Sequence, residues 1–118
     1  VKMGMWFPIQ EGFEGYENLV RQKYPDVSFF RADDNVLEFT AAHTSKGTAL
    51  QALAGELGIP MEQTLAIGDN GNDVDMIRRA GVGVAMGNAI PETKQCADWI
   101  ARTQDEDGAA DFLEEFLL

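Results

Sequence analysis

Short apolar stretches alternate with helical patterns from about residue 45 to the C-terminus, and this alternation limits the folds that the chain can adopt. The apolar stretches cover residues 64–67, 82–86 and 98–101, a usual length for a strand and too short for a helix. Strands that alternate with helices predict a parallel sheet with right-handed crossovers, because parallel strands need such connections. This part of the sequence therefore predicts an α/β fold.

Apolar side chains at helical spacing mark the helices that connect these strands. They are Ala49, Leu50, Leu53 and Leu57 in the first helix, Met76, Ile77 and Ala80 in the second, and Phe112, Leu113, Phe116 and Leu117 in the last. Gly58 and Pro60 are expected to end the first helix, and Gly81 the second. Pro91 suits the first turn of a further helix, which lies between the second and third strands.

The first 45 residues have a different pattern, which predicts a helix followed by two strands. Five aromatic or aliphatic side chains lie near one face of the predicted helix, namely Phe13, Tyr16, Leu19, Val20 and Tyr24. Pro25 ends that helix, and a polar turn at residues 33–35 separates strands at 27–31 and 36–40. We expect an antiparallel hairpin with one helix on it, and we divide the chain into domains of residues 1–42 and 43–118.

The chain has 118 residues, enough for one domain or two half-domains, and carries 20 acidic against 9 basic side chains. Its net charge of −11 excludes a broad cationic face for nucleic acid and opposes binding to anionic membranes. Clustered carboxylates suit hard divalent cations, although most of these acids are expected only to keep the surface soluble. The single Cys96 excludes an internal disulfide and fits a reducing cytoplasm. We expect a cytoplasmic protein, since the sequence contains no signal-like or membrane-length apolar stretch.

The segment from Leu65 to Asp73 has the strongest chemical pattern in the sequence. A hydrophobic strand delivers Asp69 at its C-terminal end, where open parallel sheets bind their ligands. Gly68 allows close backbone approach, and Asp73 lies one helical turn beyond Asp69. Two carboxylates at this spacing can share one hydrated Mg²⁺. The alternative is that Asp73 only caps the next helix and Asp69 only sits in a turn.

Two further polar residues follow or begin predicted elements. Lys46 begins a helix about 20 residues before Asp69, and a cation beside two carboxylates can neutralise a nucleophile and a phosphate together. The alternative for Lys46 is an ordinary solvated side chain. Asn88 follows the second parallel strand, where bracing of the Asp69 loop and an ordinary turn position are equally good interpretations.

Several motifs occur in an order and spacing typical of one enzyme family. They are Ser45-Lys46-Gly47 with Ala49-Leu50, Gly58-Ile59, Ile67-Gly68-Asp69-x-x-Asn72-Asp73-x-x-Met76, Gly83-Val84-Ala85-Met86-Gly87-Asn88-Ala89, Ala97-Asp98 and Glu106-Asp107-Gly108. From about residue 36 to the end, the chain resembles the Cof-type phosphatases, the type IIB branch of the haloacid dehalogenase-like (HAD) superfamily. The resemblance implies the C-terminal half of a HAD Rossmann-like parallel-sheet core, preceded by an αββ segment of a type IIB cap.

The resemblance also implies a mechanism and a set of roles. An aspartate attacks a phosphate monoester with the help of Mg²⁺, and water then hydrolyses the aspartyl-phosphate. In this family pattern Lys46 steadies nucleophile and phosphate, and Asn72 contacts the phosphoryl group. Asp69 is a direct Mg²⁺ ligand, while Asp73 takes part in metal binding and catalysis by holding metal-bound water. Gly68 and Asn88 have supporting roles, and the substrate is a small phosphorylated metabolite, with a sugar phosphate as the expected class.

One part of the family pattern is absent from these 118 residues. The family's nucleophile belongs to an Asp-x-Asp-Gly-Thr/Val segment, and neither this segment nor the Ser/Thr motif that follows it is present. The Asp-x-Asp at Asp73-Val74-Asp75 starts a predicted helix and does not match this segment. We therefore expect a fragment of an intact enzyme, or a truncated gene product, that is inactive alone.

The partners expected for such a chain follow from its missing strands. Ile67, Val84 and Met86 lie on strands that should neighbour the absent nucleophile strand, so we expect self-association or pairing with the missing N-terminal half. Two other functions remain as alternatives. One is a non-catalytic fragment that binds metal or phosphate weakly, and the other is a phosphomutase on the same core.

Overall fold

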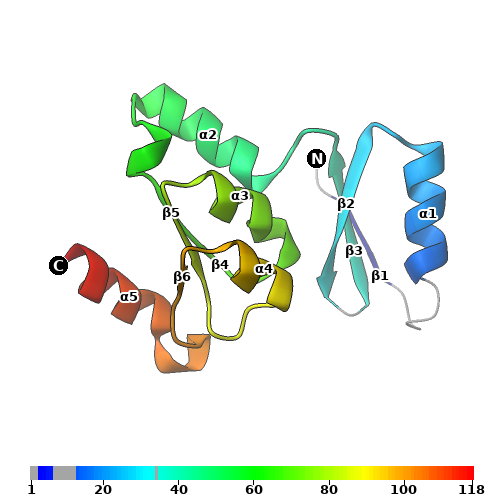
Figure 1. Ribbon diagram of the computed structural model, residues 1–118. Coiled ribbons are helices and arrows are strands. Elements are labelled where there is room, and N and C mark those ends of the chain that lie inside the picture. The colour runs from blue at the N-terminus through cyan, green and yellow to red at the C-terminus, as the bar shows by residue number, and fades with distance from the viewer. Residues whose placement is uncertain (1–2, 7–12, 34) are drawn as a thin grey trace. The chain divides into compact units, whose positions relative to one another are not determined.

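The computed structural model describes residues 3–6, 13–33 and 35–118. The chain forms two compact units, Val1–Ser45 and Lys46–Leu118, and each is described here by itself (Figure 1). The division lies three residues after the expected domain boundary between residues 42 and 43. It falls directly before the helix that begins with Lys46.

The described part of the first unit contains an antiparallel sheet and one helix. Its elements are β1 (Met3–Trp6), α1 (Phe13–Lys23), β2 (Val27–Asp33) and β3 (Val36–Ala41), and the strand order is β1-β3-β2. The predicted helix and hairpin are confirmed, although position 34 of the predicted turn lies outside the described residues. Strand β1 was not predicted, because all four of its residues are exposed and leave no alternation of buried and polar positions.

A small core joins α1 to the hairpin. Leu37 and Phe39 alternate along β3 and are buried together with Val20 of α1. Phe29 of β2 lies opposite Phe39, with the two ring centres 6.3 Å apart. The predicted apolar face of α1 is only partly correct, since Tyr16, Leu19 and Tyr24 are each about half exposed and the side chain of Phe13 lies outside the described set.

The second unit, all of whose residues are described, has the predicted alternation of strands and helices. Its strands are β4 (Leu65–Gly68), β5 (Val82–Ala85) and β6 (Trp99–Ile100), which pair in parallel in the order β4-β5-β6. Its helices are α2 (Lys46–Leu57), α3 (Val74–Arg79), α4 (Pro91–Cys96) and α5 (Gly108–Leu117). Single turns of 3₁₀ helix are η2 (Met61–Gln63), η3 (Gly71–Asp73) and η4 (Gln104–Glu106).

The C-terminus of α2 shows why the glycine at this point ends the helix. Gly58 has a φ of 67°, a left-handed conformation that is unfavourable for other residues. In this conformation the N–H of Ile59 reaches the carbonyl of Ala54, and the N–H of Gly58 reaches that of Gly55. These two hydrogen bonds form a Schellman motif and satisfy the last carbonyls of the helix.

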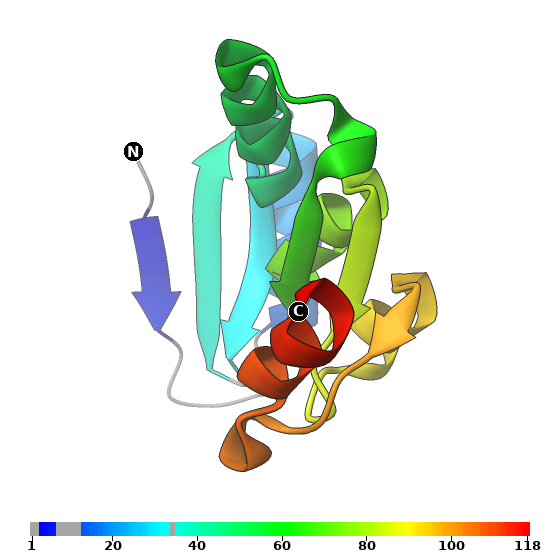
Figure 2. The ribbon, with the colours of Figure 1, turned by 90° about the vertical axis from the view of Figure 1, so that its left-hand side faces the viewer.

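The two faces of the parallel sheet differ in side-chain size. On one face the residues of β4 and β5 are all small, and they pair as Ala66 with Gly83 and Gly68 with Ala85, while β6 adds Ile100 beside Ala85. Helix α3 packs there, and a Cβ on Gly83 would overlap the backbone and side chain of Ile77. The opposite face is covered by α5 (Figure 2), and its larger side chains are Leu65, Ile67, Val82 and Val84, packed with Phe112. The small face thus lets α3 come close to the end of β4.

Helix α5 closes the second face incompletely. Phe112 stacks with Phe116 at 5.3 Å between ring centres, and Trp99 of β6 contacts both rings. Leu117 on the same predicted apolar face is 63% exposed, so the helix buries only part of that face. No helix of the described chain has the length and apolar character that a bilayer crossing requires.

Candidate active site

Strand β4 ends at Gly68, and the polar loop from Asp69 to Asp73 follows at the C-terminal edge of the sheet. Strand β5 ends at the same edge, because Met86 donates its N–H to the carbonyl of Gly68 at 2.9 Å. A Cβ on Gly68 would overlap the side chain of Asp73. The missing side chain of Gly68 therefore leaves the space that the Asp73 carboxylate occupies.

Asp73 holds the N-terminal side of this loop. Its Oδ2 accepts hydrogen bonds from the N–H groups of Asp69 at 3.0 Å and Asn70 at 3.2 Å. Asn70 is the N-cap residue of η3 and forms a capping box with Asp73. The capping role that the sequence offered as an alternative is thus present, and it fixes the backbone of Asp69 as well.

Lys46 binds the other oxygen of Asp73. Its Nζ donates to Oδ1 at 2.5 Å, and the Lys46 side chain is half exposed while that of Asp73 is buried. Lys46 is the first residue of α2, which packs on α3. Gly47 permits this packing, since a Cβ there would overlap Asp75 of α3. Burial raises the pKa of Asp73, but the bonds from Lys46 and from the two N–H groups outweigh it, so the pKa lies below its ordinary value near 3.8.

The carbonyl side of the loop is held from the start of α4. Ile90 donates its N–H to the carbonyl of Asp69 at 3.0 Å. Thr93, which is completely buried, donates its hydroxyl to the carbonyl of Asn70 at 3.1 Å. No sequence pattern predicted this role for Thr93, because one threonine in the first turn of a helix forms no recognisable motif.

Asn88 does not brace the Asp69 loop with its side chain as one interpretation proposed. Its Oδ1 accepts a hydrogen bond from the N–H of Gln104 at 3.0 Å, at the start of η4. That bond joins the loop after β5 to the loop after β6. Ile90, two residues further along, provides the brace through its backbone, and a sequence pattern does not reveal backbone contacts of this kind.

The remaining predicted site residues, Asp69 and Asn72, lie in the same loop. The Asp69 carboxylate is exposed and has no hydrogen-bond or ion-pair partner among the described residues. Asn72 places a buried Oδ1 that likewise lacks a partner in the described part of the chain. The described residues contain no group of three or more His, Cys, Asp or Glu side chains that could hold a metal.

The Asp69 carboxylate and the Asn72 side-chain oxygen nevertheless suit a hydrated Mg²⁺ as ligands. That ion usually takes one or two carboxylates together with several waters and substrate phosphate oxygens, so it does not need a cage made only of protein. Asp69 offers an uncommitted carboxylate, and the orphaned Asn72 oxygen is an acceptor that suits a cation or a donor nearby. Both Asp73 oxygens already bind other groups, which favours water-mediated rather than direct contact with a metal.

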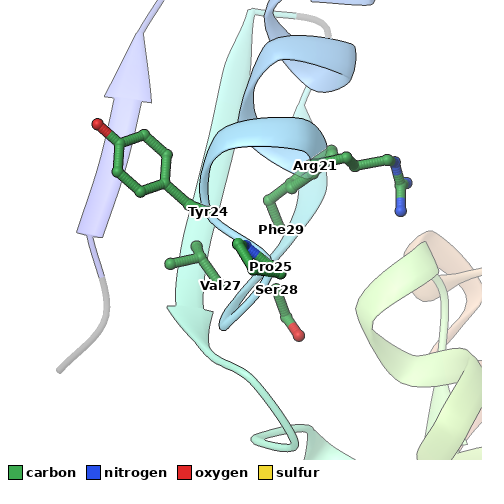
Figure 3. A pocket seen from close by; sticks show the side chains of 6 residues that line it. All are labelled: Arg21, Tyr24, Pro25, Val27, Ser28 and Phe29. Atoms are coloured by element: carbon green, nitrogen blue, oxygen red, sulfur yellow. The ribbon is translucent and has the colours of Figure 1, made fainter.

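The first unit has a separate hollow of about 420 Å³ at the end of α1. It is lined by Arg21, Tyr24, Pro25, Val27, Ser28 and Phe29. Arg21 lies over the ring of Phe29 at 4.6 Å, while the ends of Arg21 and Tyr24 point to opposite sides (Figure 3). Polar groups do not converge in this hollow, so it lacks the usual arrangement of a ligand site.

Comparison with known proteins assigns this chain to a family. A family model described as haloacid dehalogenase-like hydrolase matches residues 7–113. The chain belongs to the haloacid dehalogenase-like hydrolase family. The family resemblance expected from the motifs is therefore confirmed, and so is the fold class.

Three members of this family show how similar their sequences and structures are to this HAD-family chain. Phosphatase YwpJ of Bacillus subtilis is 38% identical over 109 residues, which are 92% of this chain and 36% of that protein. A solved HAD-like hydrolase from B. subtilis is 35% identical with a TM-score of 0.89, over 99% of this chain and 40% of that one. A HAD subclass IIB sugar phosphatase is 30% identical with a TM-score of 0.87, over 98% of this chain and 43% of that one. The HAD-family chain spans 36% to 43% of the length of these proteins.

Proposed function

We propose that this chain supplies one half of the active site of an Mg²⁺-dependent phosphatase that acts on a small phosphorylated metabolite. The observation that carries the proposal is the bridge made by Asp73, which joins Lys46 to the backbone of Asp69 and Asn70 at the C-terminal edge of a parallel sheet. Open α/β sheets bind their ligands at this edge. The names of the phosphatase relatives support the reaction class.

Each loop residue has a role in the proposed reaction. Asp69 binds the metal directly, since its carboxylate is exposed and uncommitted. Asp73 orients the Asp69 backbone and holds a water of the metal, because its own oxygens are engaged by Lys46 and by N–H groups. The bound Mg²⁺ supplies neutralisation of phosphate charge. Gly68 keeps open the space in which the Asp73 carboxylate lies.

Lys46 and Asn72 bind the phosphate in this proposal. The Lys46 side chain is half exposed, so in this proposal its ammonium reaches a substrate while it also holds Asp73. The amide of Asn72 carries N–H donors beside its buried oxygen, and these match phosphate oxygens. The step itself is attack by an aspartate that is not among the 118 residues, followed by hydrolysis of the aspartyl-phosphate.

We propose a sugar phosphate as the substrate class. The subclass IIB relative described above is a sugar phosphatase, and the first unit of this chain corresponds in our assignment to the end of a type IIB cap. A phosphomutase on the same core makes the same loop contacts, so the geometry of the second unit does not favour one reaction over the other. Product analysis separates the two, since a hydrolase releases inorganic phosphate and a mutase returns an isomeric phosphate ester.

Titration of the chain with Mg²⁺ tests the metal-binding half of this proposal. We expect shifts of the Asp69 and Asn70 amide resonances, and we expect Asp69→Asn to weaken binding about tenfold or more because it removes the charged ligand. Asp105→Asn is the matched control, since Asp105 is an exposed carboxylate on η4, a different element from the loop. Equal Mg²⁺ affinity of wild type and Asp69→Asn would contradict the assignment of Asp69.

The edge of β4 supports the proposed association with a second chain. Strand β4 stands at the end of its sheet, with β5 as its neighbour among the described strands, and Ile67 is half-buried there. The expectation that Val84 and Met86 also lie on a strand next to the absent one was wrong, because β5 pairs with β4 on one side and with β6 on the other, and Met86 follows its last residue. Pairing through the β4 edge remains, since a free edge is a template for another strand.

Sedimentation at micromolar concentration tests this association. We expect a dimer at moderate salt, where screening beyond about 10 Å weakens the mutual repulsion of the acidic chains. Addition of the N-terminal half of a related phosphatase should convert the dimer into a heterodimer. A monomer that melts cooperatively and ignores the added half would show that the chain covers its own edge.

A further inference from the structure

The peptide that joins Asp69 to the rest of its loop is held from two directions. On the N–H side, Asp73 accepts hydrogen bonds from Asp69 and Asn70. On the carbonyl side, α4 donates to both residues, through the N–H of Ile90 to Asp69 and through the hydroxyl of Thr93 to Asn70. The Asn70 carbonyl also accepts the N–H of Asp73 at 3.0 Å. The direction of the Asp69 side chain follows from this backbone, because its carboxylate makes no contact of its own among the described residues.

We propose that Thr93 is a positioning residue for the metal-binding loop, and that it sets the orientation of Asp69 through the Asn70 carbonyl. This inference rests on the proposed function, in which Asp69 binds Mg²⁺. Thr93 touches neither metal nor substrate in this arrangement. Groups that orient a metal ligand without binding the metal commonly change its affinity 10- to 100-fold when they are removed.

Because Thr93 is buried, its hydroxyl needs a hydrogen-bond partner inside the protein. The residue is completely buried, and its hydroxyl reaches the Asn70 carbonyl from a different element of the fold, 23 positions along the chain. Burial of a hydroxyl without a hydrogen bond costs free energy of folding. Valine would fill nearly the same volume and has no hydroxyl that needs a partner. Packing alone therefore does not account for a threonine at this position, whereas a bond to the loop does.

Two substitutions separate the hydroxyl from the shape of the side chain. Thr93→Val keeps the volume and removes the donor, while Thr93→Ser keeps the donor and removes a methyl group. Amide hydrogen exchange of the metal-free chain reports on the loop, through the Asp69 and Asn70 amides that donate to Asp73. The amides of Asp98 and Ala101, which bond to Gly83 and Ala85 of β5, report on the sheet.

We expect Thr93→Val to accelerate exchange at Asp69 and Asn70 about tenfold relative to Asp98 and Ala101. Its Mg²⁺ affinity should fall by about the same factor, and Thr93→Ser should restore both values to within about threefold of wild type. Uniform acceleration at all four amides would show a general loss of stability and would overturn the inference. Faster loop exchange with unchanged Mg²⁺ affinity would overturn it too.

The same experiment distinguishes a failure of the proposed function. A wild-type chain whose Asp69 and Asn70 resonances ignore Mg²⁺ contradicts the assignment of Asp69 as a metal ligand, whatever the variants do. The exchange measurement needs no metal, so it still decides whether Thr93 holds the loop. Unchanged loop exchange in Thr93→Val overturns the positioning role even if the wild type binds Mg²⁺ well.

Discussion

The 118-residue chain is expected to release no phosphate from an aryl phosphate in the presence of Mg²⁺ beyond the blank without protein. The reason is the absence of a nucleophile. Of its two Asp-x-Asp segments, residues 105–107 lie at η4 and lack the Thr or Val of the family motif. The other places Asp73 in a buried capping box and Asp75 in an ion pair with Arg79 at 2.7 Å. Neither carboxylate is arranged to attack a phosphate, and loss of a covalent nucleophile costs several orders of magnitude in rate.

Colorimetric phosphate assay over hours at micromolar chain concentration measures this directly. A preparation whose rate depends on Mg²⁺ and disappears with Asp69→Ala would show that the catalytic half has been assigned incorrectly. A rate that persists in Asp69→Ala points instead to a contaminating phosphatase. Addition of an N-terminal half that carries the Asp-x-Asp-Gly-Thr/Val segment should restore turnover if the two halves pair.

Asp73→Ala should lower the stability of the second unit by about 2 to 4 kcal/mol. The variant leaves the N–H groups of Asp69 and Asn70 without their acceptor, at about 1–3 kcal/mol for each such group when it stays dry. Lys46 adds little to this cost, because its side chain is already half exposed and its ammonium returns to water. Thermal unfolding should show a midpoint lower by about 10 °C or more.

The matched control for this variant is Asp111→Ala. Asp111 also forms an ion pair, with Arg102 at 2.9 Å, but both side chains are well exposed. Removal of an exposed pair costs about 0–1 kcal/mol, so its melting midpoint should stay close to that of the wild type. Equal shifts for Asp73→Ala and Asp111→Ala would contradict the role given to the buried carboxylate.

The pH dependence of the Asp73→Ala effect has a fixed sign. The pKa of Asp73 in the folded chain is lowered, so the unfolded chain binds the proton more readily. The contribution of Asp73 is therefore complete above the ordinary value near 3.8 and is lost as the pH falls through the lower folded value. The difference between wild type and Asp73→Ala should be constant from pH 6 to 8 and should shrink below about pH 4.

Periodicity predicted most of the second unit because its strands and helices are short and separated by glycine or proline. The strand expected at 64–67 is β4, Leu65–Gly68, and α4 begins at Pro91, the residue expected in its first turn. The first unit was harder. Its strand β1 has no buried face, and α1 buries Val20 but leaves Leu19 more than half exposed. Exposed apolar residues carry no information about a core.

The site was predictable to the extent that its residues are close in sequence. Asp69 and Asp73 are separated by one helical turn, and this spacing predicted a shared site. The same short segment also contains the capping box that Asn70 and Asp73 form. The contact of Lys46 with Asp73 spans 27 positions and needed the family resemblance. Thr93 was missed because its bond to Asn70 is made from another element and depends on complete burial, which one threonine in a sequence does not reveal.

The glycine and alanine face of the sheet has a consequence for how the chain tolerates variation. Helix α3 rests on main-chain atoms at Gly83, and Asp73 rests on them at Gly68. The spacing between these two layers is thus fixed by peptide groups, whose geometry is the same for every sequence. Substitutions on the opposite face, around Phe112 and Val84, can repack side chains without moving Asp73 towards or away from Asp69. Sequence changes are thus tolerated on the face covered by α5, while the distance from the sheet to α3 and Asp73 on the other face stays the same.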